Sequence, residues 1–357
     1  MSSYLSDRLK SVTPYKVSSH KAWEDLSLDL LKADWNESDE FFWPKDFFNL
    51  NQIDLKLNWY PNLHNSKITQ ILGKYVNLNS ENIYYSNSSD VVQENILKVF
   101  IDNDDKVLIL TPTYDNFRFS SEVFGAKTFS HKWEDLDSLK KHIELIKPKI
   151  QYICNPNNPT GDIMTLNQIE YLINKYRETI FIIDEAYWEF SSTISAASLV
   201  TENENIIVTR TLSKAFGLAG LRFGYCCASK SIIDDLYNYS SPKQVQTLTQ
   251  IIIQKAFSNI DYMHENIKKI KTNYLIILDE LIKHKFTSSS TEQNTNFILF
   301  KKNGFTSKEI QHFFELNNIS IRSLNHIDEL KDHVRISIPS SENNLIKILE
   351  AIKNFNK

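Results

Sequence analysis

The residues best suited to chemistry lie between Thr209 and Tyr225, directly after the β-rich run 206–209. Within this stretch the hydroxyls of Thr211 and Ser213 flank Lys214, and Arg222 follows eight residues later. An amine at the end of a buried strand can bond covalently to an aldehyde, and hydroxyls with a guanidinium can hold a phosphate. The stretch therefore indicates a site for pyridoxal 5′-phosphate (PLP) with Lys214 in a Schiff base. Taken alone, the stretch is more typical of a strand-to-helix turn whose Lys214 points to water.

Other polar clusters also follow strand-like runs. The apolar runs 106–110, 150–154 and 180–183 precede Tyr114, Asn158 and Asp184, respectively. Apolar strands that alternate with helices favour a parallel sheet covered on both faces. Open sheets of this kind bind ligands outside the carboxyl ends of their strands. We therefore expect these clusters to converge on one crevice with Lys214.

The types of these residues suit the ring of PLP. No G-x-x-x-x-G-K-[ST] or G-x-G-x-x-G segment exists, which argues against a nucleotide hydrolase or a dinucleotide enzyme. A buried Asp184 needs a partner, and the pyridine nitrogen of PLP supplies one. Tyr187 and Asn158 could contact the phenolic oxygen, and Tyr114 could stack on the ring. Each of these three also has a purely structural interpretation.

The phosphate of PLP needs hydrogen-bond donors. Asp90 and Gln93 have the spacing of a capping box, which predicts a helix that starts at Asp90. The N–H groups of Ser89 and Asp90 would then lie at the positive end of the helix. The hydroxyls of Thr211 and Ser213 and the guanidinium of Arg222 would complete the phosphate site.

Four motifs connect the chain to a known family. They are NPNNPTG at 155–161, DEAY at 184–187, TLSK at 211–214 with AGLR at 219–222, and RIS at 335–337. Their order and spacing over nearly the whole chain resemble the fold-type I PLP enzymes, and within them the histidinol-phosphate aminotransferase family.

The resemblance implies an α/β fold of the fold-type I PLP transferase class. A large domain with a mainly parallel seven-stranded sheet between helices would occupy 35–245, and a smaller α+β domain would occupy 246–357. Residues 1–34 would form an N-terminal segment that joins the small domain. The patterns after Pro242 predict a long helical region over about 245–284, strands at 296–300, 319–322 and 334–338, and helices at 307–316 and 341–354.

The resemblance also implies roles for individual residues. The catalytic residues would be Lys214, Asp184 and Tyr187, and the remaining cofactor contacts would be Ser89, Asp90, Tyr114, Asn158, Thr211, Ser213, Arg222 and Tyr60. Tyr60 would reach the site of the partner subunit in a homodimer. Arg335 would bind the substrate carboxylate and Arg322 its other anionic group, with Tyr15 and Asn36 also in the substrate pocket. No metal site is expected.

The expected reaction is transfer of an amino group between an amino acid and a small phosphorylated ketone. The donor would be glutamate, which leaves as 2-oxoglutarate, and the ketone would be imidazole-acetol phosphate or dihydroxyacetone phosphate. The segment 36–44 departs from the family pattern, which leaves the substrate open. Decarboxylation of an O-phospho amino acid is the alternative, and a non-catalytic PLP-binding protein is a more distant one.

Composition limits the remaining classes. The 357 residues are 41% hydrophobic and 24% charged with a net charge of −4, which gives no basic excess for nucleic acid. No apolar run approaches the ~20 residues of a membrane-spanning helix, and residues 1–20 lack the apolar core of a signal peptide. The three cysteines, Cys154, Cys226 and Cys227, lie in strand-like runs and suit a reducing cytoplasm. We therefore expect a cytoplasmic enzyme.

Overall fold

The structure is a computed structural model that describes residues 5–15, 20–24, 29–45, 47, 56–63, 65–133, 135–289 and 292–355. Its α-helices are α1 (Lys21–Glu24), α2 (Ser66–Val76), α3 (Ser89–Phe100), α4 (Asn116–Val123), α5 (Leu136–Ile146), α6 (Leu166–Lys175), α7 (Lys230–Tyr239), α8 (Thr247–Ser258), α9 (Asp261–Lys283), α10 (Ser307–Leu316) and α11 (Glu342–Asn354). Its strands are β1 (Leu31–Lys32), β2 (Ile83–Ser86), β3 (Lys106–Thr111), β4 (Lys127–Lys132), β5 (Ile150–Cys154), β6 (Ile180–Asp184), β7 (Ile206–Thr211), β8 (Gly224–Ala228), β9 (Thr287–Ser288), β10 (Phe297–Lys301), β11 (Ile319–Ser320), β12 (Arg322–Ser323) and β13 (Val334–Ser337).

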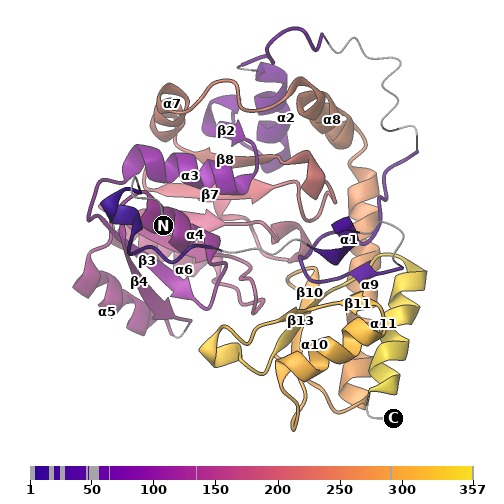
Figure 1. Ribbon diagram of the computed structural model, residues 1–357. Coiled ribbons are helices and arrows are strands. Elements are labelled where there is room, and N and C mark those ends of the chain that lie inside the picture. The colour runs from indigo at the N-terminus through magenta and orange to yellow at the C-terminus, as the bar shows by residue number, and fades with distance from the viewer. Residues whose placement is uncertain are drawn as a thin grey trace.

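A seven-stranded sheet forms the centre of the larger part of the molecule (Figure 1). Its strand order is β2-β8-β7-β6-β5-β3-β4. The pairs from β7 through β4 are parallel, whereas β8 is antiparallel to both of its neighbours. The predicted fold class, with a mainly parallel seven-stranded sheet, is therefore confirmed.

Helices cover both faces of this sheet. In β7, Ile206 and Val208 belong to one buried cluster and Ile207 belongs to the other, because successive side chains of a strand point to opposite faces. The first face is covered by α2, α5, α6 and α8, and the second by α3, α4 and α7. Burial on both faces explains why these strands are apolar at nearly every position.

A second, smaller sheet with the order β12-β13-β10-β9 lies in the C-terminal region, next to α9, α10 and α11 (Figure 1). The short strand β1 from the N-terminal region pairs in parallel with β11. The domain limits at 34 and 245 stay a prediction. Within the described part of the chain, no helix combines the length and apolar character that a membrane crossing requires.

Local predictions were correct in type more often than in detail. The region 245–284 contains two helices, α8 and α9. The region 319–322 contains the short strand β11 and the first residue of β12, and these two strands pair with different partners. The capping box at Asp90 was wrong. The helix starts one residue earlier, and Ser88, with φ +86°, accepts from the N–H of Val91. Gln93 turns instead toward the sheet, where it bonds Asp184.

Candidate active site

Asp184 ends β6 as a buried carboxylate. Its Oδ2 accepts from the hydroxyl of Tyr152 at 2.8 Å and from Nε2 of Gln93 at 2.9 Å, and its Oδ1 accepts from the N–H of Ala186 at 3.2 Å. Burial raises the pKa of Asp184, and the bonds from Tyr152 and Gln93 oppose the rise. The three donors are neutral, so the negative charge of Asp184 has no cation among the described residues.

Lys214 lies three residues beyond the end of β7. Its Nζ donates to the backbone carbonyl of Trp35 at 3.0 Å and lies 5.8 Å from the centroid of the Tyr187 ring. Burial, aided by the charge of Arg335, lowers the pKa of Lys214 to about 8. A substantial fraction of this amine is therefore neutral near pH 8, as a nucleophile or a proton carrier requires.

Asn36 contacts Tyr187. Its Nδ2 donates to the Tyr187 hydroxyl at 2.9 Å, and its backbone N–H donates to Oγ of Ser337 at 3.0 Å. Asn36 is buried and has φ +55°, a left-handed conformation that asparagine tolerates better than most residues. Asn36 thus joins β13 to the turn after β6, a role that the sequence did not indicate.

Arg335 on β13 is buried and lies against the predicted ring contacts. Its Nη1 donates to Oδ1 of Asn158 at 2.5 Å, and its Nη2 donates to the carbonyl of Asp34 at 2.7 Å. A guanidinium only donates, so Asn158 must turn its oxygen toward Arg335 and keep its amide N–H groups for another acceptor. The Nε of Arg335 has no hydrogen-bond partner within the described residues.

The predicted phosphate donors gather at the start of α3. Gly224 on β8 allows this approach, because a Cβ there would lie 2.1 Å from the nitrogen of Ser89. Thr211 and Ser213 lie in direct contact, with their hydroxyls 2.9 Å apart. The backbone N–H groups of the first helical turn, next to these hydroxyls, can receive an anion.

Asp90 connects this group to the aromatic side of the site. Its carboxylate pairs with Arg222 at 3.4 Å and accepts from the hydroxyl of Tyr114 at 3.4 Å. The ring of Tyr114 packs edge-on against Tyr15, with centroids 6.3 Å apart. Burial raises the pKa of Tyr15, and the hydrogen bond with Tyr114 and the charge of Arg322 oppose the rise.

Tyr60 was predicted to reach the site of a partner subunit, and within the described residues no hydrogen bond, ion pair or ring contact joins it to these groups. Its side chain is 77% exposed, and the amine of Lys243 lies 3.9 Å from its ring centroid. The sequence argument missed Gln93, Tyr152 and the carbonyls of Asp34 and Trp35. The spacing of Gln93 from Asp90 suggested a helix cap and gave no sign of a contact with Asp184. That contact depends on how α3 packs on the sheet.

These groups fit PLP. The uncompensated, buried Asp184 suits a protonated pyridine nitrogen, because a buried carboxylate needs a charged or hydrogen-bonding partner. The lowered pKa of Lys214 suits covalent attachment to an aldehyde, and the start of α3 with two hydroxyls suits a phosphate. The individual roles of these residues stay predictions.

Comparisons with known proteins agree with the fold and with the family resemblance. A family model described as aminotransferase class I and II matches residues 51–352. The chain is 33% identical to the dihydroxyacetone phosphate transaminase of Campylobacter jejuni over 98% of this chain and 96% of that one. It is 32% identical to the histidinol-phosphate aminotransferase of Ruminiclostridium cellulolyticum over 90% of this chain and 91% of that one.

The fold is also similar to that of a solved histidinol-phosphate aminotransferase from Sinorhizobium meliloti. The TM-score is 0.87 with 99% of both chains covered, although the sequences are only 19% identical. The chain belongs to the class I and II aminotransferases, and the resemblance to the histidinol-phosphate aminotransferase family is confirmed. It is a PLP-dependent aminotransferase.

Proposed function

We propose that this enzyme transfers an amino group from glutamate to a small phosphorylated ketone. The observation that supports the proposal is the pairing of Arg322 with Arg335. The two residues are directly opposite each other in the antiparallel pair β12–β13, so their side chains leave the same face. Burial and the charge of Arg322 both lower the pKa of Arg335. Two neighbouring cations of this kind suit a substrate with two anionic groups.

Each substrate of such a reaction carries negative charge that these cations can bind. Glutamate carries two carboxylates, and a phosphorylated ketone offers a dianionic phosphate. Arg335 would bind the carboxylate next to the reacting carbon, and Arg322, which has no anionic partner within the described residues, would bind the distal carboxylate or the phosphate. The relative from Campylobacter jejuni is named for dihydroxyacetone phosphate, which makes a three-carbon ketone phosphate the first candidate to test.

The proposed work of the chain follows from the site. Bound PLP supplies an aldehyde that takes up the amino group and a ring that accepts electrons from the substrate carbon. Asp184 would hold the pyridine nitrogen in its protonated form, and Tyr187 and Asn158 would donate to the phenolic oxygen. Lys214 would carry the proton away from the substrate carbon, and its pKa of about 8 suits that task near neutral pH.

A substrate comparison tests the proposal. The enzyme would be incubated with glutamate and either dihydroxyacetone phosphate, imidazole-acetol phosphate or unphosphorylated dihydroxyacetone, and 2-oxoglutarate would be measured. We expect turnover with a phosphorylated ketone and much less with the unphosphorylated one. Equal rates for both three-carbon ketones, or no 2-oxoglutarate at all, would contradict the proposal. Release of carbon dioxide from an O-phospho amino acid would instead indicate the decarboxylase.

Arg322→Gln gives a second measurement. We expect the KM for the phosphorylated ketone to rise roughly tenfold or more, because the variant loses a charge-assisted contact. Lys132→Gln is a matched control, because Lys132 is an exposed cation that already pairs with Glu329. Its KM should match that of the wild type.

We also propose a homodimer in which Tyr60 reaches the site of the partner. Leu57, Trp59 and Tyr60 are all at least 66% exposed, and exposed apolar groups of this size are typical of interfaces. Sedimentation of the wild type and of Trp59→Glu would test the dimer, and a wild-type monomer would refute it.

A cytoplasmic location is proposed from the three cysteines, which are unpaired thiols.

A further inference from the structure

The segments that carry Asp184 and Lys214 are joined to each other on the face of the sheet that α3 does not cover. Asp184 and Thr209 are register partners in β6 and β7, and both accept from Gln93 on the α3 side. The next residue of each segment, Glu185 and Arg210, points to the other face, because side chains alternate along extended backbone. Arg210 is only 1% exposed, although it is charged.

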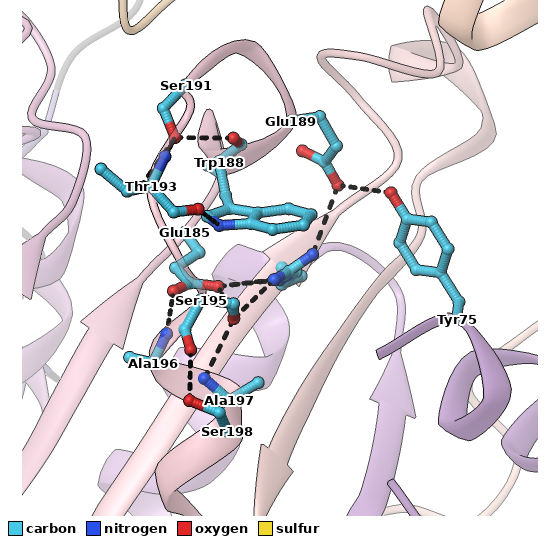
Figure 2. A network of polar contacts seen from close by, with 12 residues as sticks. Tyr75, Glu185, Trp188, Glu189, Ser191, Thr193, Ser195, Ala196, Ala197 and Ser198 are labelled. Carbon is cyan, nitrogen blue, oxygen red and sulfur yellow. Dashed lines mark hydrogen bonds and ion pairs between the residues drawn. The ribbon is translucent and has the colours of Figure 1, made fainter. Parts of the chain in front are cut away.

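Arg210 is surrounded by groups from the turn that follows β6. Its Nε and Nη2 donate to Oε2 of Glu185 at 3.0 and 2.7 Å, and Nη2 also donates to the hydroxyl of Ser195 at 2.7 Å. Its guanidinium carbon lies 4.0 Å from the ring centroid of Trp188, and its Nη1 lies 3.7 Å from Glu189. Figure 2 shows these partners, with Glu185, Ser195, Trp188 and Glu189 labelled.

The turn is further tied through Glu185. Its Oε1 accepts from the N–H of Ala196 at 2.7 Å, and its Oε2 accepts from the hydroxyl of Ser195 at 2.7 Å. These bonds connect the turn to the 3-10 helix η5 (Ala196–Leu199). The backbone N–H of Glu185 donates to the carbonyl of Thr209 at 2.9 Å, and this bond continues the pairing of β6 with β7.

The partners of Arg210 lie on both sides of Tyr187 in the sequence. Glu185 precedes this tyrosine by two residues, and Trp188 and Glu189 follow it. A planar guanidinium that bonds one side of the turn and stacks on the other restricts the path of the backbone between them. Its removal would leave a buried carboxylate without its cation, and the turn would have to rearrange to reach water.

We propose that Arg210 is a positioning residue for the cofactor site. Through Glu185 and Trp188 it holds Tyr187 and Asp184 against PLP, although it touches neither the cofactor nor the substrate. The inference rests on the proposed roles of Asp184, Tyr187 and Lys214. Its consequence is that Arg210 sets the protonation behaviour of the bound cofactor.

The experiment compares Arg210→Met with the wild type as purified holoenzymes. The visible absorbance of the bound cofactor is titrated with pH, and the rate of PLP loss is measured by dialysis. In Arg210→Met we expect the pH midpoint of the absorbance titration to rise by about one pH unit, because a displaced Tyr187 no longer stabilises negative charge on the phenolic oxygen of the cofactor. We expect PLP to be lost roughly tenfold faster. Arg210→Lys keeps the charge but not the fork, and should recover part of the midpoint shift.

Two controls separate positioning from general loss of stability. Ile348→Ala removes buried side-chain volume in α11, and Tyr75→Phe removes a hydroxyl that contacts Glu189 at 3.4 Å. Both should keep the wild-type midpoint even where the thermal midpoint falls. An Arg210→Met protein that loses thermal stability but titrates like the wild type would overturn the inference. If Arg210→Met does not fold, Glu185→Gln provides the same comparison with a neutral, similarly shaped side chain.

The two proposals can fail separately. If the Lys214→Ala variant has the same visible absorbance as the wild type, the proposed site is refuted, and with it the role of Arg210. A wild type whose absorbance depends on Lys214, together with an Arg210→Met variant of unaltered midpoint, would refute the role of Arg210 alone.

Discussion

The amine of Lys214 donates to the backbone carbonyl of Trp35, although 179 positions separate the two residues. The residues on either side of Trp35 contact two other members of the site. The Asp34 carbonyl accepts from Arg335, and the Asn36 side chain donates to Tyr187. One short segment therefore connects the amine of Lys214, the guanidinium of Arg335 and the hydroxyl of Tyr187.

The first prediction concerns the pKa of Lys214. Arg335 lowers this pKa by charge repulsion, so Arg335→Gln should raise it above about 8 toward the ordinary value of 10.5. The pH dependence of Lys214 acetylation in protein freed of PLP, followed by mass spectrometry, measures this value. Burial persists in the variant, so the rise should be partial. A midpoint that stays at the wild-type value would show that Arg335 has no electrostatic influence on the amine.

The second prediction separates the backbone of Asn36 from its side chain. Asn36→Gly tolerates φ +55° but loses the contact with Tyr187, whereas Asn36→Ala loses the contact and strains the backbone. We expect Asn36→Ala to be less stable than Asn36→Gly by about 1 kcal/mol in urea unfolding. Both should have reduced activity. Equal stabilities would mean that the left-handed conformation carries no cost here.

The third prediction uses two glycines with different surroundings. At Gly224 a Cβ would lie 2.1 Å from the nitrogen of Ser89, whereas at Gly220 nothing lies within 4 Å. Gly224→Ala should displace the start of α3, cost about 1–3 kcal/mol of stability and weaken the retention of PLP. Gly220→Ala should resemble the wild type in unfolding and in dialysis. Strong PLP retention by Gly224→Ala would argue against a phosphate site at α3.

The fourth prediction concerns the second carboxylate near Arg210. Burial raises the pKa of Glu189 above its ordinary value of 4.5, and Arg210 opposes the rise. The folded protein therefore binds this proton more tightly than the unfolded chain, and stability falls as the pH rises above 4.5. Glu189→Gln cannot ionise, so its stability should fall less between about pH 5 and about pH 8. The prediction would be contradicted if the free energies of unfolding in urea of wild type and variant changed in parallel over this pH range.

The sequence was most informative where chemistry follows a buried strand. Asp184 and Lys214 could be placed beyond β6 and β7 because apolar runs mark parallel strands, and the carboxyl ends of such strands meet at one edge. The motif order then predicted the seven-stranded sheet, which the structure confirms. The helix at Asp90 was predicted correctly in type, but its cap was not, because Ser88 adopts a positive φ that the sequence does not reveal.

The sequence by itself thus determined the class of fold, the family and the residue types that suit PLP. Tertiary structure decided which groups support them: Gln93 and Tyr152 beside Asp184, the carbonyls of Asp34 and Trp35 beside Arg335 and Lys214, and Arg210 behind the turn. Every residue has a carbonyl, and glutamine and tyrosine are common in many settings, so residue type alone does not indicate these contacts. They arise only when segments far apart in the chain pack together and bury their polar groups, which must then find partners.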